Sequence, residues 1–494
     1  MRAAIGSAPK LGPAASPWSD RLLLGQRCPA RKEAQLAAGV TFTASTLEAA
    51  HDYAQAQELQ GLGKWEEAIP RYESAIRVDP DLGRAYAGVA VMYRNLGRRE
   101  DAEKYYKMAM VRLDRMSERE RHRTRGGYFV TVGDHQKAIE EFTALVSEYP
   151  ADFVGHSNLA LANFLAGDMS KALAEGRRAV AIYPRNIVMR TNLALYALYA
   201  GDFAAAEKEA RGILAANRSY GGVYVCLALA LLAQGRGDEA VQTYNQLQSL
   251  DAAGASVASM GLADEAMYEG RLNDAVAILE AGIRSDQANK NPSAAERKAA
   301  ALAMAHFKLG NSRQALARAD FTAAATRQPA VLFELALVFL DAGREDRARE
   351  LASGLAKRLQ PEPQAYAKLI EGEASLRKHN TFEALRQFQE AQKLADTWLG
   401  RLALGRAYLE AEGYAEASAE FEQCMKRRGE ATSVFLDDVP TLHYYPQLLY
   451  YTGRAQQGLG SAAAANSYRA FLDIKKKSDP DRQVEDAKRR LSAF

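Results

Sequence analysis

The chain is poor in cysteine, in proline and in long apolar runs. Its 494 residues include three cysteines, Cys28, Cys226 and Cys424, and 15 prolines. The cysteines are odd in number and far apart, with no CxxC pair, which argues against a zinc cage or a disulfide framework. No stretch reaches the roughly 18 consecutive apolar residues that a membrane helix needs. We therefore expect reduced thiols in a soluble, cytoplasmic protein.

Charge of one sign is also lacking, because the formal net charge is only +3. So small a net charge on a long chain creates no field that would attract nucleic acid or an anionic membrane. We expect no nucleic-acid partner and no membrane segment. Alanine, by contrast, is abundant, and an alanine-rich, proline-poor composition favours helices. Residues 1–45 are rich in Ala, Gly, Pro and Ser without a periodic stripe, which predicts a disordered leader.

A repeat of about 34 residues runs through the rest of the chain. The stretch LGKWEEAIPRYESAIRVDP (62–80) aligns without a gap with LGRREDAEKYYKMAMVRLD (96–114), and the same pattern recurs further on. Alanines mark its register at intervals of 33 to 47 residues: Ala68, Ala102, Ala138, Ala172, Ala206, Ala240, Ala275, Ala315, Ala348, Ala384, Ala417 and Ala464. A period near 34 with Gly, Ala, an aromatic residue and Pro in this order is the tetratricopeptide signature.

Each element of the repeat has a physical role. Glycines such as Gly63, Gly97 and Gly133 stand where the first helix must end and the chain must turn, which favours a residue free to adopt positive φ. The register alanine lets two helices approach closely. A bulky residue such as Tyr72 fills the space between helices, and a proline such as Pro150 ends the second helix. The prediction is an all-α fold, an α-α superhelical solenoid of about twelve tetratricopeptide helix pairs.

Irregular spacings divide the repeats. We place an N-terminal array at 46–297, a C-terminal array at 298–475 and a capping helix at 476–494. The polar stretch SDQANKNPSAAE (285–296) lies in a spacing of 40 residues, which indicates a longer loop between repeats. The stretch FLDDVPTLHYYP falls in the longest spacing, within an inserted loop at 429–446.

The inserted loop holds the strongest candidate for chemistry. Asp437, Asp438 and His443 are residue types that a hydrolase or a metal site uses. The sequence has no HExxH, GxSxG or GxGxxG motif, and nothing supplies a nucleophile, oxyanion donors or a cofactor cradle. The favoured alternative is a turn followed by aromatic anchors that lead into the next helix. We therefore expect no enzyme activity, no cofactor and no bound metal.

A second cluster consists of arginines within 112–127. Arg119, Arg121 and Arg123 could form an anion patch for phosphate or nucleic acid. Acidic residues are interleaved with them, and no aromatic residues stand between them to stack bases. A solvated helix face with internal ion pairs is therefore favoured over an anion site.

A stack of helix pairs has a concave face lined by the first helix of each repeat. Asn158 and Asn192 occupy the same repeat position, 34 residues apart. Their amides could pair with the backbone of an extended peptide or bond within the stack. Arg84 and Arg94, on the first helix of the second repeat, could add positive charge to this groove, and we place His156 on the same face. The predicted partner is a protein or peptide.

Three runs of the chain are more specific than the repeat itself: 110–152, FLAGDMSKALAEGRRAVAIYPRN at 164–186, and 429–475. They resemble the C-terminal tetratricopeptide region of eukaryotic-like bacterial serine/threonine protein kinases, of the kind common in acidobacteria. The resemblance extends over most of the repeats. It implies a sensory or protein-docking module, either a stand-alone relative or a fragment of such a kinase.

The motifs of the kinase domain itself are missing, because no H-R-D loop, D-F-G motif or Gly-rich nucleotide loop occurs. A chaperone-type carboxylate clamp is not matched either, since Ala87 and Val91 stand at its Lys and Asn positions in the second repeat. The favoured function is a non-enzymatic scaffold in bacterial signalling or complex assembly. The alternative is the orphaned sensory or regulatory region of a serine/threonine kinase or a transcriptional regulator, periplasmic if that kinase is membrane-anchored. The oligomeric state stays open.

Overall fold

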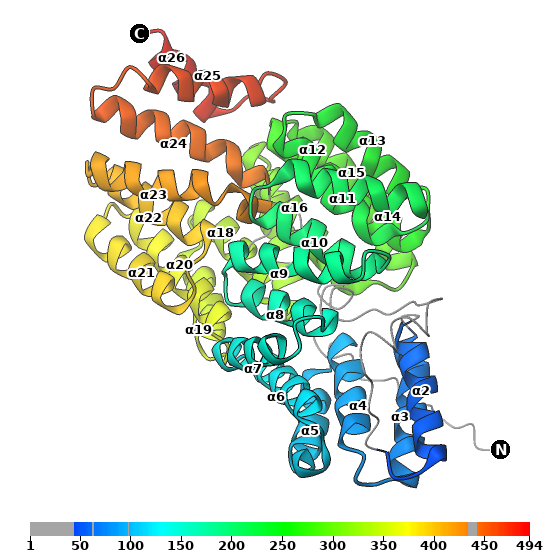
Figure 1. Ribbon diagram of the computed structural model, residues 1–494. Coiled ribbons are helices and arrows are strands. Elements are labelled where there is room, and N and C mark those ends of the chain that lie inside the picture. The colour runs from blue at the N-terminus through cyan, green and yellow to red at the C-terminus, as the bar shows by residue number, and fades with distance from the viewer. Residues whose placement is uncertain (1–43, 62–63, 97, 433–441) are drawn as a thin grey trace, which may run out of the picture. The chain divides into compact units, whose positions relative to one another are not determined.

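The computed structural model describes residues 44–61, 64–96, 98–432 and 442–494. These ranges form 25 helices and four short 3-10 turns, without a strand (Figure 1). Twelve consecutive helix pairs are followed by one final helix: α2 (Leu47–Gly61) with α3 (Trp65–Val78), α4 (Gly83–Asn95) with α5 (Arg99–Met110), α6 (Glu118–Val132) with α7 (His135–Glu148), α8 (Phe153–Leu165) with α9 (Met169–Ile182), α10 (Ile187–Tyr199) with α11 (Phe203–Ala216), α12 (Tyr224–Ala233) with α13 (Gly237–Gln248), α14 (Ala252–Glu269) with α15 (Leu272–Ala288), α16 (Pro292–Lys308) with α17 (Ser312–Ala325), α18 (Pro329–Asp341) with α19 (Glu345–Ala356), α20 (Pro361–Arg377) with α21 (Thr381–Leu394), α22 (Trp398–Glu410) with α23 (Tyr414–Lys426), α24 (Tyr445–Gly458) with α25 (Ala464–Ile474), and then α26 (Arg482–Leu491). The predicted all-α solenoid is confirmed.

The twelve register alanines all lie in the second helix of a pair, and every one of them is fully buried. A larger side chain at such a point would push the helices apart, because protein interiors are close-packed. The periodicity seen in the sequence is therefore the period of the closest helix–helix contacts. These contacts form the continuous core of a repeat stack.

Large aromatic rings from the second helices pack against glycines of neighbouring first helices. A methyl group at Gly88 in α4 would lie 2.5 Å from the ring of Tyr72 in α3, and one at Gly405 in α22 would lie 2.5 Å from the ring of Phe421 in α23. Both rings are fully buried. Glycine is required at these positions because the ring occupies the space that a side chain would need.

The turns within repeats follow the predicted chemistry. Gly133, Gly167 and Gly201 adopt φ of 85°, 82° and 78°, which confirms the expected left-handed conformation. The residue after each of them is an aspartate whose carboxylate caps the second helix, as when Asp168 accepts a hydrogen bond from the Lys171 backbone at 3.0 Å. Gly63 and Gly97 lie outside the described residues.

Second helices end two residues before a proline in three repeats, because α3, α7 and α9 stop at Val78, Glu148 and Ile182. By contrast, the longer loop expected at 285–296 is wrong. Helix α15 continues to Ala288 and α16 begins at Pro292, and each of them has 17 residues. The additional residues of this repeat extend its helices, and Pro292 fits because the first turn of a helix needs no backbone N–H from it.

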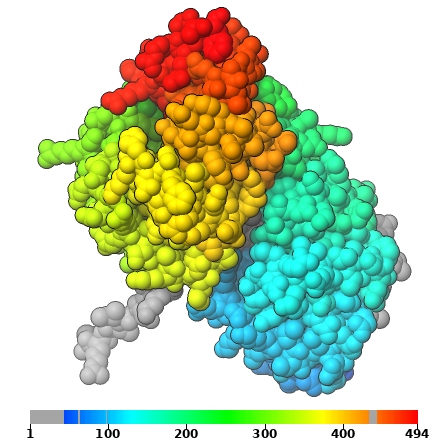
Figure 2. All heavy atoms as spheres, turned by 90° about the vertical axis from the view of Figure 1, so that its left-hand side faces the viewer, coloured from blue at the N-terminus to red at the C-terminus, as the bar shows by residue number. Residues whose placement is uncertain are grey.

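The chain divides into two compact units, residues 1–196 and 197–494, with α10 spanning the boundary. The two predicted arrays, 46–297 and 298–475, group the repeats differently from these units. That grouping remains a prediction. In the second unit, α23, α24, α25 and α26 follow one another as a stacked end, orange to red in both views (Figure 1, Figure 2). Helix α26 contributes the buried Val484 and Ala487 to this end.

The segment that follows α25 contacts α14 and α15 near the middle of the chain. Asn273 donates a side-chain hydrogen bond to Asp479 at 2.8 Å, across 206 residues of sequence. Lys475 donates from Nζ to the Met267 carbonyl at 3.0 Å. The repeats of this unit therefore wind far enough for its end to touch its earlier helices.

Candidate functional site

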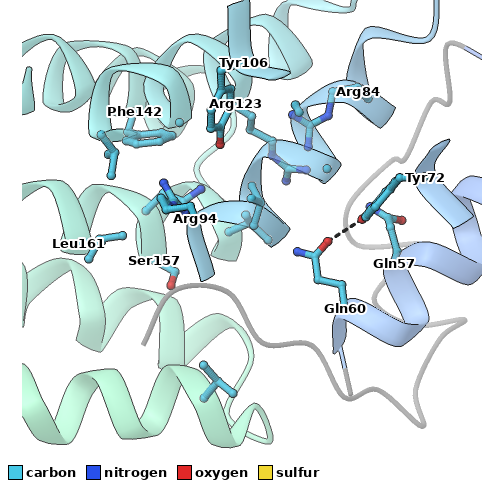
Figure 3. A pocket seen from close by; sticks show the side chains of 18 of the residues that line it. Gln57, Gln60, Tyr72, Arg84, Arg94, Tyr106, Arg123, Phe142, Ser157 and Leu161 are labelled. Atoms are coloured by element: carbon cyan, nitrogen blue, oxygen red, sulfur yellow. Dashed lines mark hydrogen bonds between the residues drawn. The ribbon is translucent and has the colours of Figure 1, made fainter. Parts of the chain in front are cut away.

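A pocket in the first unit collects all four residues that the sequence places in the groove. Arg84 and Arg94 reach it from α4, Asn158 from α8 and Asn192 from α10. It encloses about 920 Å³, including the solvent at its mouth, and its wall consists mainly of first helices. Figure 3 shows the side chains around this space. The four residues therefore line one pocket, as the sequence predicted. Their role in binding is a proposal.

Arg94 is the most unusual of these residues. It is 8 % exposed, and its Nε is buried without a hydrogen-bond partner. Its guanidinium makes neither a hydrogen bond nor an ion pair with any residue that the structure describes. Removing a charged group from water costs on the order of several kcal/mol, unless a partner group compensates the charge.

Arg84 has only a neutral partner. Its Nη1 donates to the Thr124 hydroxyl at 3.0 Å, and that hydroxyl donates in turn to the Met116 sulfur at 3.4 Å. No carboxylate in the described part of the chain forms an ion pair with Arg84. Burial opposes the charge of Arg84, but Tyr53 and Glu120 nearby hold its pKa above the ordinary value, so protein groups partly balance this charge.

Arg123, on α6, is a third arginine of the pocket. Its sequence neighbours had suggested a different role, as part of an anion patch with Arg119 and Arg121. Arg123 donates to both carboxylate oxygens of Asp152 at 2.7 Å, while Arg119 donates from Nε to the same carboxylate at 2.8 Å. Asp152 is almost fully buried and also accepts from the Gly155 backbone. Burial alone would raise the pKa of Asp152, but Arg123 and Arg119 hold it below its ordinary value.

The anion patch expected from Arg119, Arg121 and Arg123 is thus occupied by protein groups. Arg121 pairs with Glu118 and also donates to the Leu113 carbonyl at 3.0 Å. The paired helix face, which the sequence favoured, describes this arrangement better than an open anion site. These pairings do not support the binding of an external anion by the patch.

Among the described residues, those that line the pocket include three arginines and no aspartate or glutamate. Burial lowers the pKa of Arg123, and the positive charges of Arg119 and Arg84 add to this effect against the attraction of Asp152. Repulsion between arginines shows that the positive charge here is close together and incompletely neutralised. The site favours an anionic group.

The amides of the pocket differ in their surroundings. Asn158 is half-buried, and its side chain forms no hydrogen bond with a described residue. Asn192 is only 4 % exposed. On the opposite side, the Gln60 amide oxygen accepts from the Tyr72 hydroxyl at 2.5 Å (Figure 3), and Gln57 donates to Tyr53 at 3.0 Å. Amides at such positions can donate to and accept from a peptide backbone.

His156 does not belong to the groove, which corrects the expectation from the sequence. It is 6 % exposed, with Nδ1 bonded to Glu175 at 2.6 Å and Nε2 at 3.0 Å from the Pro150 carbonyl. Neighbouring positions of a helix point in different directions, so Asn158 lines the pocket while His156 joins α8 to α9.

The candidate cluster in the inserted loop is resolved in part. Asp437 and Asp438 lie outside the described residues. His443 is buried and donates from Nδ1 to Asp264 in α14, whose carboxylate also accepts from the backbone of Leu442 at 3.1 Å. Burial lowers the pKa of His443, although Asp264 opposes this shift. The Asp264–His443 pair joins the last repeat to α14.

The described residues hold no group of three or more His, Cys, Asp or Glu side chains that could bind a metal ion. Cys226 and Cys424 are free and buried, and burial raises the pKa of Cys226 to about 12, so this thiol stays protonated and unreactive. None of the helices in the described ranges is both long and apolar enough to cross a membrane.

The repeat of helix pairs defines a helical-repeat protein, and its first unit contains a pocket lined mainly by first helices. A family profile described as a tetratricopeptide repeat matches residues 53–114, 124–187, 191–256 and 300–363, which together make up more than half of the chain. The chain belongs to the tetratricopeptide repeat family.

Solved structures similar to this chain include a tetratricopeptide repeat protein from Parabacteroides merdae, at 16 % identity and a TM-score of 0.36. That match covers 59 % of this chain and 98 % of the other. Another is PilW, described as a widely conserved type IV pilus biogenesis factor, at 17 % identity and a TM-score of 0.35, covering 42 % of this chain and 94 % of PilW. At these TM-scores neither carries an argument about function. Among curated proteins, none matches the chain.

Proposed function

We propose that the first unit binds an extended segment of a partner protein in its concave pocket and catalyses no reaction itself. The observation that carries this proposal is Arg94, which lines the pocket and is buried without a hydrogen-bond partner among the described residues. Buried polar groups in folded proteins are normally hydrogen-bonded. Groups that are left over in a pocket are therefore groups that a ligand satisfies.

A peptide suits this surface better than a small molecule. The polar groups are spread over four first helices, α4, α6, α8 and α10. An extended strand presents backbone donors and acceptors at regular intervals, so repeat-spaced amides such as Asn158 and Asn192 can pair with it in succession. Tetratricopeptide repeats generally mediate contacts between proteins, which agrees with this use of the groove.

The biological setting of this binding remains a finer proposal. The resemblance of three runs to the repeats of bacterial serine/threonine kinases supports a role in signalling or complex assembly. A sensory or regulatory region separated from such a kinase is compatible with the same groove, because docking a protein segment requires no catalytic residue.

The test begins with selection of binders from a display library of random short peptides against the whole chain. The strongest binder is then titrated by fluorescence anisotropy. We expect Asn158→Ala and Asn192→Ala each to weaken binding by about three- to tenfold, which corresponds to about one net hydrogen bond. Asn245→Ala, at an exposed amide on α13, is the matched control and leaves binding unchanged.

Two outcomes contradict the proposal. In one, no peptide is enriched over repeated selections. In the other, the control weakens binding as much as the pocket variants do. Circular dichroism of each variant shows whether a loss of binding comes from a loss of helix.

A further inference from the structure

We infer that the bound segment carries an acidic side chain whose carboxylate pairs with the guanidinium of Arg94. This inference rests on the proposed function, and it adds the chemistry of the residue that anchors the segment.

Arg94 supplies the first argument. Its side chain is more than nine-tenths buried, lines the pocket and has no partner among the described residues. A guanidinium offers five N–H donors in a planar fork and stays charged at all ordinary pH values. Leaving such a group buried and unpaired is costly, and an incoming carboxylate removes this cost with two parallel hydrogen bonds.

Arg84 and Arg123 supply the second argument. Figure 3 shows Arg84, Arg94 and Arg123 around one space, and none of the described residues that line it is acidic. Arg123 shares the carboxylate of Asp152 with Arg119, and Arg84 has a hydroxyl as its hydrogen-bond partner. Arg94 is therefore the anchor for a carboxylate, and the other arginines of the pocket add positive charge around it.

The aromatic residues of the pocket argue against a nucleic acid. Recognition of single strands requires exposed aromatic faces on which bases stack. Tyr72, Tyr106 and Phe142 line the pocket, but each is no more than 2 % exposed. Their rings fill the space between helices, so the surface offers charge and amides without a stacking platform.

The chain offers a matched pair of substitutions for testing the anchor. Arg94→Gln removes the charge inside the pocket and keeps a polar side chain. Arg71→Gln removes the same charge from an exposed position on α3, so the two variants have equal net charge. Peptides are selected separately from the same random display library against the wild type and against both variants.

We expect the wild type and Arg71→Gln to enrich peptides with Asp or Glu at one position, and Arg94→Gln to lose this enrichment. In a selected peptide, replacing the acidic residue by its amide weakens binding to the wild type at least about tenfold and has little effect on Arg94→Gln. A peptide with phosphoserine at that position shows whether a phosphate binds there more tightly than a carboxylate.

The results separate this inference from the proposed function. Peptides that bind the groove without any acidic preference overturn the carboxylate anchor and leave peptide binding intact. Equal loss of the acidic preference in Arg71→Gln overturns it too, because the effect would then come from net charge. A phosphate preference of about tenfold or more replaces the carboxylate by a phosphorylated residue. Failure to select any peptide contradicts both proposals.

Discussion

The contact between the last repeat and α14 can be broken at one residue, Asp264. Its buried carboxylate accepts from the backbone of Leu442 at 3.1 Å, from the backbone of His443 at 3.3 Å, and from the His443 ring. Asp264→Ala leaves all three donors without this acceptor in a region that water does not enter. A hydrogen bond to a charged group contributes about 1.5–3 kcal/mol, and each orphaned donor adds a desolvation cost.

Because two of the three hydrogen bonds are long, we take the lower value for each of them. The two long bonds then contribute about 3 kcal/mol together, and with about 1.5–3 kcal/mol for the bond to the His443 ring the expected loss is about 4.5–6 kcal/mol of local stability. A repeat stack opens in parts rather than all at once, so the loss falls on the segment from Leu442 through α24. About 3 kcal/mol, the share of the two long bonds alone, corresponds to exchange of backbone hydrogens roughly a hundred times faster.

Hydrogen exchange followed by mass spectrometry measures this effect peptide by peptide. We expect faster exchange in peptides that begin at Leu442 and in those that cover α14, with α2 to α9 unchanged. Asp238→Ala, at an exposed aspartate on α13, is the matched control. Exchange at 442–458 that stays within about threefold of the wild type refutes the reasoning, because three lost hydrogen bonds cannot leave the segment equally stable.

Three further variants test the packing, the pocket and the buried charge. Gly405→Ala lowers the free energy of unfolding by about 1–3 kcal/mol because its methyl group overlaps the ring of Phe421. Gly354→Ala, with open space around the new methyl group, raises the free energy of unfolding by about 1 kcal/mol. Arg94→Met raises stability by up to about 2 kcal/mol, since it removes a buried charge without a partner. Burial lowers the pKa of Lys475 to about 7 from 10.5 in the unfolded chain. The unfolded state binds more protons between these values, so stability rises as pH increases from about 7, and Lys475→Met removes this rise.

Each of these expectations has an outcome that would contradict it. Equal effects of the two glycine variants would show that helix propensity alone decides, and a destabilised Arg94→Met would show that the guanidinium stabilises the fold. Circular dichroism melts measure both. For Lys475, melts across pH 7 to 10 that run parallel for the wild type and the variant would show that another group carries the pH dependence.

Much of the fold follows from local patterns in the sequence. The alanine register predicts the second helices, because every repeat needs a small residue at the same close contact. The pattern is less informative where repeats lengthen: the polar stretch at 285–296 has loop-like composition, yet most of it is helical because packing against neighbouring helices outweighs weak local preferences. The placement of Asn158 and Asn192 at one surface also follows from the repeat, since equal positions in stacked repeats face the same side.

The sequence by itself therefore determined the class of fold and the repeat length, because these depend on spacings within one or two repeats, whereas it placed His156 wrongly and missed Arg123 in the pocket. Only the tertiary structure decided which charges find partners. Arg119 and Arg123 form ion pairs with Asp152, about thirty residues away, and His443 bonds to Asp264 across 179 residues. Arg94 forms no hydrogen bond or ion pair with a described residue. A local pattern cannot encode such pairs, because the winding of many repeats sets the distance between their ends.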